Sequence, residues 1–359
     1  MSPKSTLNLG IVGLSTKGWA SAAHFPALTR SSIQSKFTIS AVHNSSEASA
    51  KAAALTYDEK LSNTKDPLDA HRAPLKAFHG EASAMANDPD VDVVAITVKA
   101  PDHASFVYAA ISAGKSVMVE YPPGVNLQET EEMKRRLDES RGKIKAMVGL
   151  QGRQSSTIQK VKKAIESGKI GGIVSTTIIC SVPCEMQAWQ LEAREGGEYL
   201  LDDKNGASMF SICGGHNLDT VIYLLGEFKS VSAAASTQYP TTAIIPSSPN
   251  GRPKVVRMQV SSGAQVTLPP WIIDGEHGSI KLELSQGGAF PGPFTSLKDA
   301  SVSVDGVDLE EYISAEELEF KDDLALRDGE KGTLTEFIQR EWVEFAKALN
   351  GGEGEFATG

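Results

Sequence analysis

The chain has 359 residues, enough for two domains with large cores. Its hydrophobic and charged fractions, 40% and 22%, are those of an ordinary globular protein, and its net charge is -10 at pH 7. This acidic balance argues against direct nucleic-acid or acidic-membrane binding, since no basic excess is available to neutralise phosphates. The sequence shows neither a membrane-spanning apolar run nor the apolar core of a signal peptide, which predicts a cytoplasmic protein.

A glycine-rich turn follows the first predicted strand, residues 7–14. It reads Gly13-x-Ser15-x-x-Gly18, a variant of the dinucleotide-binding fingerprint with Ser15 at the middle glycine. The first glycine permits the tight turn, and the last lets the following helix pack on the strand. The helix N-terminus then faces the pyrophosphate with its partial positive charge. A strand–helix turn that binds no ligand is the alternative at this point.

Strands and helices alternate along the N-terminal part of the chain. Further strands are predicted at 37–43, 91–97, 116–120 and 145–150. The segments between them predict helices at 47–55, 103–113 and 127–141, with an irregular polar loop over 57–76. This alternation is typical of an α/β Rossmann-like doubly wound parallel sheet, which binds its ligand at the carboxyl ends of the strands.

The pattern changes after Gly152. A helix over 155–167 is followed by long β-like stretches, which predict an α+β domain with a large, mostly antiparallel sheet. These stretches are 173–182, 229–239, 254–262, 264–268 and 279–283, with a hairpin turn at 261–263. A final amphipathic helix over 333–349 carries an apolar packing face.

We therefore expect three regions. A dinucleotide-binding domain covers 1–152, a substrate and dimerisation domain covers 153–350, and a flexible tail covers 351–359. Cys180, Cys184 and Cys213 have no framework spacing, which is typical of reduced thiols in an intracellular protein. No histidine cluster accompanies them, so no metal site is predicted.

Motifs in a consistent order resemble the glucose–fructose oxidoreductase / inositol dehydrogenase / MocA family. They are the turn at 10–18, Asp90–Thr97, Ala113–Glu120 with Pro122, Ile165–Gly172, Gly214-Gly-His216-x-x-Asp219, and Gly275–Ile280. The resemblance implies a catalytic trio in which a lysine follows the glutamate and an aspartate precedes the histidine by one helical turn. Here Tyr121 stands at the lysine position and Ile212 at the aspartate position, so only His216 remains.

These departures leave Tyr121 and His216 as the catalytic candidates. A phenol can donate a proton, but its reference pKa of about 10 makes it a poor base. Isoleucine cannot orient an imidazole, so a structural role for His216 is an equal alternative. We expect Asp219 one turn further on the same helix face.

The residues at 13–19, 98–103 and 150–155, with an aromatic at 121, resemble a branch that includes the galactose-pathway transcriptional repressors of yeasts. That resemblance implies binding of a nicotinamide dinucleotide and function through protein contacts. Two functions therefore stay open. One is an NADP(H)-dependent oxidoreductase-type enzyme for a carbonyl or alcohol, possible in fungal secondary metabolism. The other is a catalytically inactive, cofactor-binding co-regulator with a protein partner and access to the nucleus.

The second strand ends in Asn44, Ser45 and Ser46, without the acidic residue that NAD-preferring sites place there. We therefore predict NADP(H), with helix capping as the other role for these serines. The residues expected at the cofactor are Gly13, Ser15, Lys17, Gly18, Trp19, Asn44, Ser45, Ser46, Lys99, His103, Glu120 and Arg153. Arg153 is expected either to bridge Glu120 and the cofactor or to lock the domain junction.

Glu185, Trp189 and Tyr199 resemble the family's substrate wall, although aromatic residues there also suit a core. The partners we expect are a small-molecule substrate and a second copy of the chain in a dimer formed through the antiparallel sheet.

Overall fold

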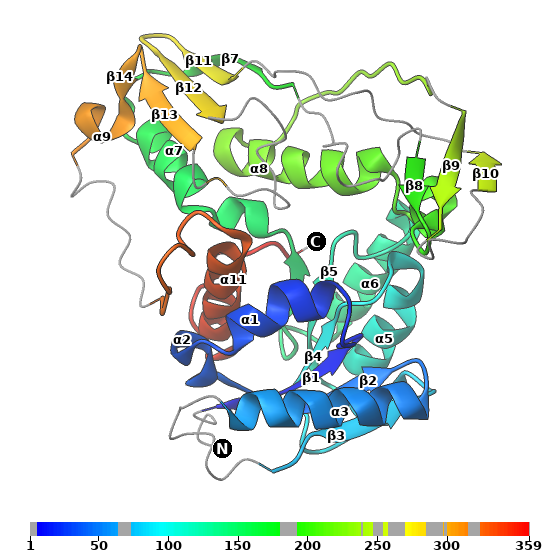
Figure 1. Ribbon diagram of the computed structural model, residues 1–359. Helices are drawn as coiled ribbons and strands as arrows, with labels where there is room; N and C mark the ends of the chain where they lie inside the picture. Colours follow the sequence, from blue (N-terminus) through cyan, green and yellow to red (C-terminus); the bar gives the residue numbers. More distant parts are fainter. Residues whose placement is uncertain are drawn as a thin grey trace. The chain divides into compact units, whose positions relative to one another are not determined.

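The computed structural model of the chain forms two compact units (Figure 1). The first comprises Met1–Leu150, Asp323–Glu330 and Ile338–Gly359, and the second comprises Gln151–Asp322 and Lys331–Phe337. The structure describes residues 6–63, 73–179, 192–237, 240–246, 254–257, 270–284, 297, 300–314 and 324–358. Whereas the sequence analysis assigns all of 153–350 to the second domain, the chain rejoins the first unit after Phe337.

The first unit is built on a six-stranded sheet in which all neighbouring strands are parallel. Its strands are β1 (Leu7–Val12), β2 (Phe37–Asn44), β3 (Lys76–His79), β4 (Val93–Ile96), β5 (Ser116–Glu120) and β6 (Ala146–Gly149). Their order, β3-β2-β1-β4-β5-β6, is that of the doubly wound dinucleotide-binding fold. The predicted Rossmann-like sheet is therefore confirmed.

Helices connect the parallel strands. The longest are α3 (Glu47–Ser62), α5 (Ala100–Ser112) and α6 (Leu127–Glu139). α3 packs along β2 and β3, and α5 packs along β4 and β5 (Figure 1). This arrangement leaves the carboxyl ends of β1 and β4, where the strand order reverses, as the ligand edge of the sheet.

The region between β2 and β4 differs from the prediction. α3 continues to Ser62 instead of ending at residue 55, because Tyr57 and Leu61 prolong its buried face. Residues 76–79 form β3, where no strand is predicted. β3 is an edge strand in which only Phe78 is even half-buried, so it lacks the alternating apolar pattern of a half-buried strand.

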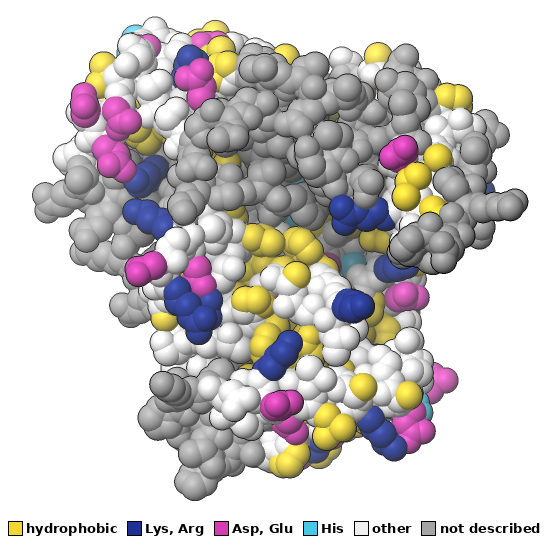
Figure 2. Space-filling model, in the orientation of Figure 1, with side chains coloured by type: hydrophobic (Ala, Val, Ile, Leu, Met, Phe, Trp, Pro, Cys, Tyr) yellow, Lys and Arg dark blue, Asp and Glu magenta, His cyan; other side chains and the backbone are white. Residues whose placement is uncertain are grey.

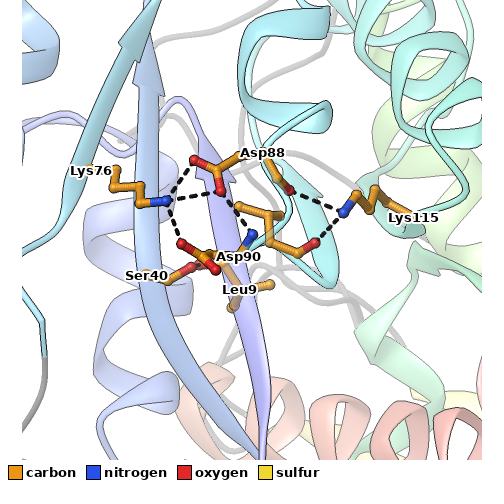
Figure 3. Close-up of polar contacts among 7 residues, drawn as sticks. Leu9, Ser40, Lys76, Asp88, Asp90 and Lys115 are labelled. Carbon is orange, nitrogen blue, oxygen red and sulfur yellow. Dashed lines mark hydrogen bonds and ion pairs between the residues drawn. The ribbon is translucent and has the colours of Figure 1, made fainter. Parts of the chain in front are cut away.

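An ion-pair network stands at the amino ends of β3, β4 and β5, opposite the ligand edge (Figure 3). The Lys76 ammonium contacts both Asp88 oxygens, at 2.9 and 2.8 Å, and Asp90 at 2.7 Å. Lys115 donates to the backbone carbonyls of Asp88 and Val91, over 3.1 and 2.6 Å. Burial alone would raise the pKa of Asp88, but the hydrogen bonds from Lys76 and from the Asp90 amide lower it. The network therefore ties strand ends together.

Residues 351–358, expected as a flexible tail, pack against the first unit. The Val148 amide in β6 donates a hydrogen bond of 2.9 Å to the carbonyl of Ala357, which is buried. The rings of Phe356 and Phe345 meet edge-on, with centroids 5.3 Å apart. The glycine-rich composition of 351–359 did not predict the hydrogen bond between Val148 and Ala357, because backbone groups form it.

The second unit contains α7 (Ser156–Glu166) and two sheets. The larger has the order β14-β13-β12-β11-β7, and its neighbouring strands are all antiparallel. Its strands are β7 (Ile173–Thr177), β11 (Trp271–Gly275), β12 (Ser279–Leu284), β13 (Ala300–Val304) and β14 (Val307–Asp308). The smaller, mixed sheet consists of β8 (Glu192–Arg194), β9 (Thr241–Ile245) and β10 (Lys254–Arg257). The predicted α+β class is thus confirmed.

The sequence predicts a strand over 229–239, but residues 229–237 form none in the structure and are exposed, and residues 238–239 lie outside the described residues. This stretch is rich in alanine and serine, with only Val231 and Thr237 β-branched. Such a segment becomes a strand only when another strand pairs with it, and propensity does not report that pairing. The predicted strand 264–268, the turn at 261–263, Cys180 and Cys184 lie outside the described residues.

The last helix, α11 (Leu334–Leu349), contributes to the cores of both units. Phe337 belongs to the apolar cluster of the second unit. Trp342 lies in the first unit, where its ring meets Phe37 edge-on at 5.2 Å. Both side chains are 0% exposed, which confirms that the apolar stripe is a packing face.

In the described part of the chain, no helix combines the length and the apolar character needed to cross a bilayer. On the described surface in Figure 2, basic and acidic side chains are interspersed, so this face carries no continuous field of one sign.

Candidate functional site

The predicted cofactor residues of the first unit gather at one edge of the parallel sheet. Val12 pairs with His43 on one side and with Ile96 on the other, so the segments after β1, β2 and β4 are neighbours. Glu120, at the end of β5, lies opposite Gly149 of β6. The topology therefore brings together residues that are far apart in the sequence.

Gly13 adopts a conformation that suits only glycine. Its φ is +89°, and an added Cβ would lie 2.8 Å from Val98 Cγ1 and 3.0 Å from the Thr97 carbonyl oxygen. Its amide donates to the His43 carbonyl over 2.9 Å. The turn is thus held tightly at the ligand edge. Because Gly13 has no side chain, its backbone stays accessible there. This geometry fits a dinucleotide pyrophosphate.

The loop from Ser15 to Gly18 is shaped by local hydrogen bonds. Ser15 Oγ donates to the Lys17 carbonyl over 2.7 Å, and the Gly18 amide donates to Ser21 Oγ over 3.1 Å. Tyr57 of α3 donates its hydroxyl to the Ser15 carbonyl over 2.7 Å. Lys17 and Gly18 are exposed, so they are accessible to a ligand.

The three polar residues at the end of β2 have different surroundings. Asn44 is buried, and its side-chain amide donates to the Leu14 and Ser49 carbonyls over 3.3 Å each. Ser46 caps α3, because its Oγ accepts a hydrogen bond of 3.2 Å from the Ser49 amide. Ser45 is exposed. The capping role is therefore present at Ser46, and Ser45 remains open to a ligand.

Glu47, the first residue of α3, brings a carboxylate close to this strand end. It pairs with Lys51, one helical turn later, over 2.6 Å, and both side chains are exposed. The hydrogen bond from Lys51 lowers the pKa of Glu47. The sequence analysis missed this acid because the expected position for it is the strand end itself.

Lys99 and His103 stand at the start of α5. Lys99 is the exposed N-cap residue. His103 is buried, and its ring nitrogens lie 3.0 Å from the Pro122 carbonyl oxygen and 2.9 Å from that of Val98. The imidazole therefore joins the loop after β4 to the loop after β5, which makes it a positioning residue for both.

Glu120 lies at the centre of a mostly buried network. Trp19 Nε1 donates to Glu120 Oε1 over 2.9 Å, and His24 Nε2 contacts the same oxygen. Trp342 Nε1 donates to His24 Nδ1 over 3.2 Å. The structure thus brings Trp19 and Glu120 together, as residues of one predicted site. It also adds His24, and it adds Trp342, for which the sequence indicated only a packing face.

Tyr121 directly follows Glu120 and is half-buried against the apolar core of the first unit. It precedes a cis peptide bond to Pro122. The aromatic side chain therefore takes the position after the strand-ending glutamate, where the family resemblance implies a lysine.

In the second unit, the other catalytic candidate lies on α8 (Gly215–Leu225). His216 is 3% exposed, and its carbonyl accepts a hydrogen bond of 3.1 Å from Thr220 Oγ1. Asp219 forms a two-point ion pair with Arg153, in which Arg153 Nε donates to Oδ2 over 3.1 Å and Nη2 contacts Oδ1. Burial raises the pKa of Asp219, and Arg153 opposes this effect.

This ion pair belongs to a cluster that the sequence analysis did not predict. Arg153 Cζ and Lys162 Nζ lie 5.3 and 3.7 Å from the ring centroid of Tyr223. Gln159 Nε2 donates to the Tyr223 hydroxyl over 2.7 Å. The helical spacing of Asp219 and Tyr223 was the available signal, since residues four apart share a face. Arg153 thus holds Asp219 and Tyr223 of α8 in place within the second unit.

Of the predicted substrate residues, Tyr199 is described. It is half-buried in a short 3-10 turn (Glu198–Leu201), and burial raises its pKa. Its phenol therefore stays neutral at ordinary pH. Glu185 and Trp189 lie outside the described residues. Within the described ranges, no three His, Cys, Asp or Glu residues are grouped as a metal site.

Comparison with known proteins adds two family matches. Residues 7–150 match the oxidoreductase family with an NAD-binding Rossmann fold, known as GFO_IDH_MocA. Residues 156–269 match the C-terminal domain of Gal80p. The two matches cover the parallel sheet and part of the second unit.

Two curated relatives and one solved structure are similar to this chain, and they include both a dehydrogenase and a regulatory protein. Dehydrogenase aclE of Aspergillus oryzae is 32% identical over 302 residues, which are 77% of this chain and 76% of that protein. The galactose/lactose metabolism regulatory protein GAL80 of Kluyveromyces lactis is 26% identical over 249 residues, 67% of this chain but only 50% of that protein. A super-repressor mutant of Gal80p from Saccharomyces cerevisiae has a similar fold, with a TM-score of 0.67 at 19% identity, covering 97% of this chain and 95% of that one. The chain therefore belongs to the GFO_IDH_MocA oxidoreductase family and carries a Gal80-like C-terminal domain.

Proposed function

We propose that the protein is an NADP(H)-dependent oxidoreductase that acts on the carbonyl or alcohol group of a small molecule in fungal secondary metabolism. The observation that carries the proposal is the Gly13 turn, whose positive φ and close contact with the segment after β4 exclude a side chain at the ligand edge. The 32% identity to a fungal dehydrogenase over most of both chains supports an enzyme of this class.

The end of β2 supports NADP(H) as the cofactor. Ser45 is exposed beside the capped start of α3, and Lys51 supplies an ammonium group one turn into that helix. Hydroxyl and ammonium donors suit a 2′-phosphate, whereas a strand-end acid would repel it. Glu47 is already paired with Lys51, which reduces its own repulsion.

The bound dinucleotide supplies or accepts the hydride at the nicotinamide C4. We propose Tyr121 or His216 as the residue that moves the accompanying proton. The Tyr121 phenol can donate a proton to a developing alkoxide, and a neutral imidazole at His216 can accept one. With isoleucine at position 212, a carboxylate does not orient His216 from that position.

We expect the protein to bind NADPH more tightly than NADH and to bind ATP weakly. The physical reason is the donor set around Ser45 and Lys51 together with the absence of a strand-end acid. Titration calorimetry with the three nucleotides measures this order. Replacing Ser45 by alanine should weaken NADPH binding by about tenfold or more, since one hydrogen bond to a charged group is lost. Negligible binding of all three nucleotides would disprove the site.

Turnover should depend on the two proton-transfer candidates. Once a panel of carbonyl compounds identifies a substrate through NADPH oxidation, Tyr121→Phe and His216→Ala are each measured for kcat and KM. Loss of the proton-transfer residue is expected to reduce kcat by about 100-fold or more while nucleotide binding is unchanged. If the double variant keeps wild-type turnover, the catalytic assignment is wrong.

A cofactor-binding co-regulator is the second candidate. The match of residues 156–269 to the Gal80p C-terminal domain and the replacement of the family's lysine by Tyr121 favour it. The two candidates share the cofactor site and differ in turnover. Tight NADP(H) binding without hydride transfer to any carbonyl in the panel would support the regulator.

We also propose that the protein forms a dimer through the antiparallel sheet of the second unit. β7 is an edge strand, and Ile173 and Val174 on it are 36% and 69% exposed. Exposed apolar side chains on the outer face of an antiparallel sheet are a surface that a second copy of the chain can cover. Light scattering at micromolar concentration should give twice the chain mass. Val174→Lys should shift the mass toward the monomer, and a monomeric wild type would contradict the proposal.

A further inference from the structure

Hydrogen bonds connect the C-terminal helix α11 to the end of β5 within the first unit. Trp342 Nε1 donates to His24 Nδ1 over 3.2 Å, and His24 Nε2 contacts Glu120 Oε1. Trp19 Nε1 donates to the same oxygen over 2.9 Å. Trp342 and His24 are 0% and 2% exposed, so water does not compete for these bonds. Trp19 and His24 thus both contact Glu120 Oε1, and Trp342 contacts His24.

The chemistry of the donors indicates which nitrogen of the His24 ring carries the proton. An indole N–H can only donate, so His24 Nδ1 must accept from Trp342. The ring proton of a neutral imidazole is then on Nε2, which donates it to Glu120 Oε1. That oxygen therefore accepts from both His24 and Trp19. Trp342 acts on Glu120 through the tautomer that it imposes on His24.

The second carboxylate oxygen has different surroundings. A Cβ added to Gly149 would lie 3.1 Å from Glu120 Oε2, so the missing side chain of this glycine leaves room for the Glu120 carboxylate. Glu120 ends β5, which belongs to the β4–β6 half of the sheet. The Gly13 turn and the end of β2 serve the pyrophosphate and the adenosine half of a dinucleotide. The β4–β6 half therefore takes the nicotinamide half.

We infer that His24 and Trp342 are positioning residues that hold Glu120 toward the nicotinamide half of the cofactor. The inference rests on the proposed dinucleotide function and adds two residues that do not themselves contact the cofactor. Its specific claim is that the Nε2–H tautomer of His24, set by Trp342, holds Oε1 and so orients Oε2 for the hydroxyl and amide groups of the ligand.

Two probes separate positioning from general stability. NADPH contains both halves of the cofactor, whereas adenosine 2′,5′-bisphosphate contains only the adenosine half. Glu120→Gln and His24→Leu should weaken NADPH binding on the order of tenfold, and Trp342→Phe about threefold. None of them should change the affinity for the bisphosphate by more than about twofold. His24→Gln should keep most of the NADPH affinity, because its amide offers one acceptor and one donor.

Trp342→Phe is a mild change, because it retains a ring against Phe37 and removes the N–H. Trp271→Phe in the second unit is the matched control, since it loses a comparable indole bond of 2.8 Å to Thr176 Oγ1. It should leave the affinity for both probes unchanged. Nitrogen-15 NMR of histidine-labelled protein provides a readout independent of the cofactor, with the expected proton on Nε2 of His24.

The inference is overturned by a proton on Nδ1 of His24, or by equal weakening of both probes in Trp342→Phe. Unchanged NADPH affinity in Glu120→Gln would overturn it as well while leaving the dinucleotide function intact. A wild-type protein that binds neither probe would instead remove the dinucleotide function, and the inference with it.

Discussion

Replacing Gly13 by valine should abolish dinucleotide binding. The residue has φ +89°, and a Cβ would lie 2.8 Å from Val98 Cγ1 and 3.0 Å from the Thr97 carbonyl oxygen. A β-branched side chain therefore forces the turn away from the segment after β4, and the pyrophosphate loses its backbone donors. Calorimetry with NADPH should show an affinity loss of about 100-fold or more, and strain should lower the free energy of unfolding by about 1–3 kcal/mol.

Gly114 provides the control for this experiment. It also has a positive φ, +72°, but an added Cβ meets nothing within 4 Å. It lies just before β5, at the edge of the sheet opposite the ligand. Gly114→Val should therefore cost stability only through its φ, less than Gly13→Val does, and leave NADPH binding intact. Normal NADPH affinity in Gly13→Val would show that this turn does not bind the nucleotide.

Removing Arg153 should destabilise the protein more than the loss of a surface ion pair. Arg153 and Asp219 are 18% and 11% exposed, and the two side chains meet at two points. Arg153→Met leaves the Asp219 carboxylate largely buried without its cation, which should cost about 3–5 kcal/mol at pH 7.5. Urea unfolding measures the cost. Lys134→Met, which removes an exposed pair with Asp138, should change stability by about 0.5 kcal/mol or less.

The penalty for Arg153→Met should depend on pH in a defined direction. Burial raises the pKa of Asp219 in the folded protein, and loss of Arg153 raises it further. The folded state therefore binds the proton more tightly than the unfolded state, so acidification favours folding at this group. The penalty should shrink as the pH falls from 7.5 toward the raised pKa. The double variant with Asp219→Asn should recover most of the stability at every pH, and a penalty that grows on acidification would contradict this explanation.

The sequence predicts best where a local pattern decides the structure. β5 (Ser116–Glu120) occurs within its predicted bounds, because a buried parallel strand is an uninterrupted apolar stretch between two breakers. The Gly13 turn was predictable for a similar reason, since one residue type tolerates its φ. β3 was not predictable, because it pairs at a sheet edge through its backbone and leaves Lys76 and His79 exposed.

The connections between the candidate site residues were not predictable from the sequence. Glu120 and Trp19 are both named from motifs, yet their hydrogen bond joins residues 101 positions apart. The bond between Trp342 and His24 spans 318 positions, and no local pattern encodes such a pairing. Arg153 was expected either at the cofactor or at the domain junction, and the structure adds an ion pair with Asp219 that the sequence did not predict.

The division of α11 between the two units has a consequence for synthesis on the ribosome. The first unit includes Met1–Leu150 but also Ile338–Gly359, so the ribosome must synthesise residues 151–337 before the part of α11 that belongs to this unit emerges. Until then, Phe37 lacks the Trp342 ring, and the Leu150 amide lacks the Glu341 carboxylate that accepts from it over 3.0 Å. Until α11 is synthesised, part of the apolar core of the N-terminal fragment stays exposed. Chaperones bind nascent chains in this state. A premature stop that removes only the last helix should therefore produce an aggregating chain rather than a shortened, working one.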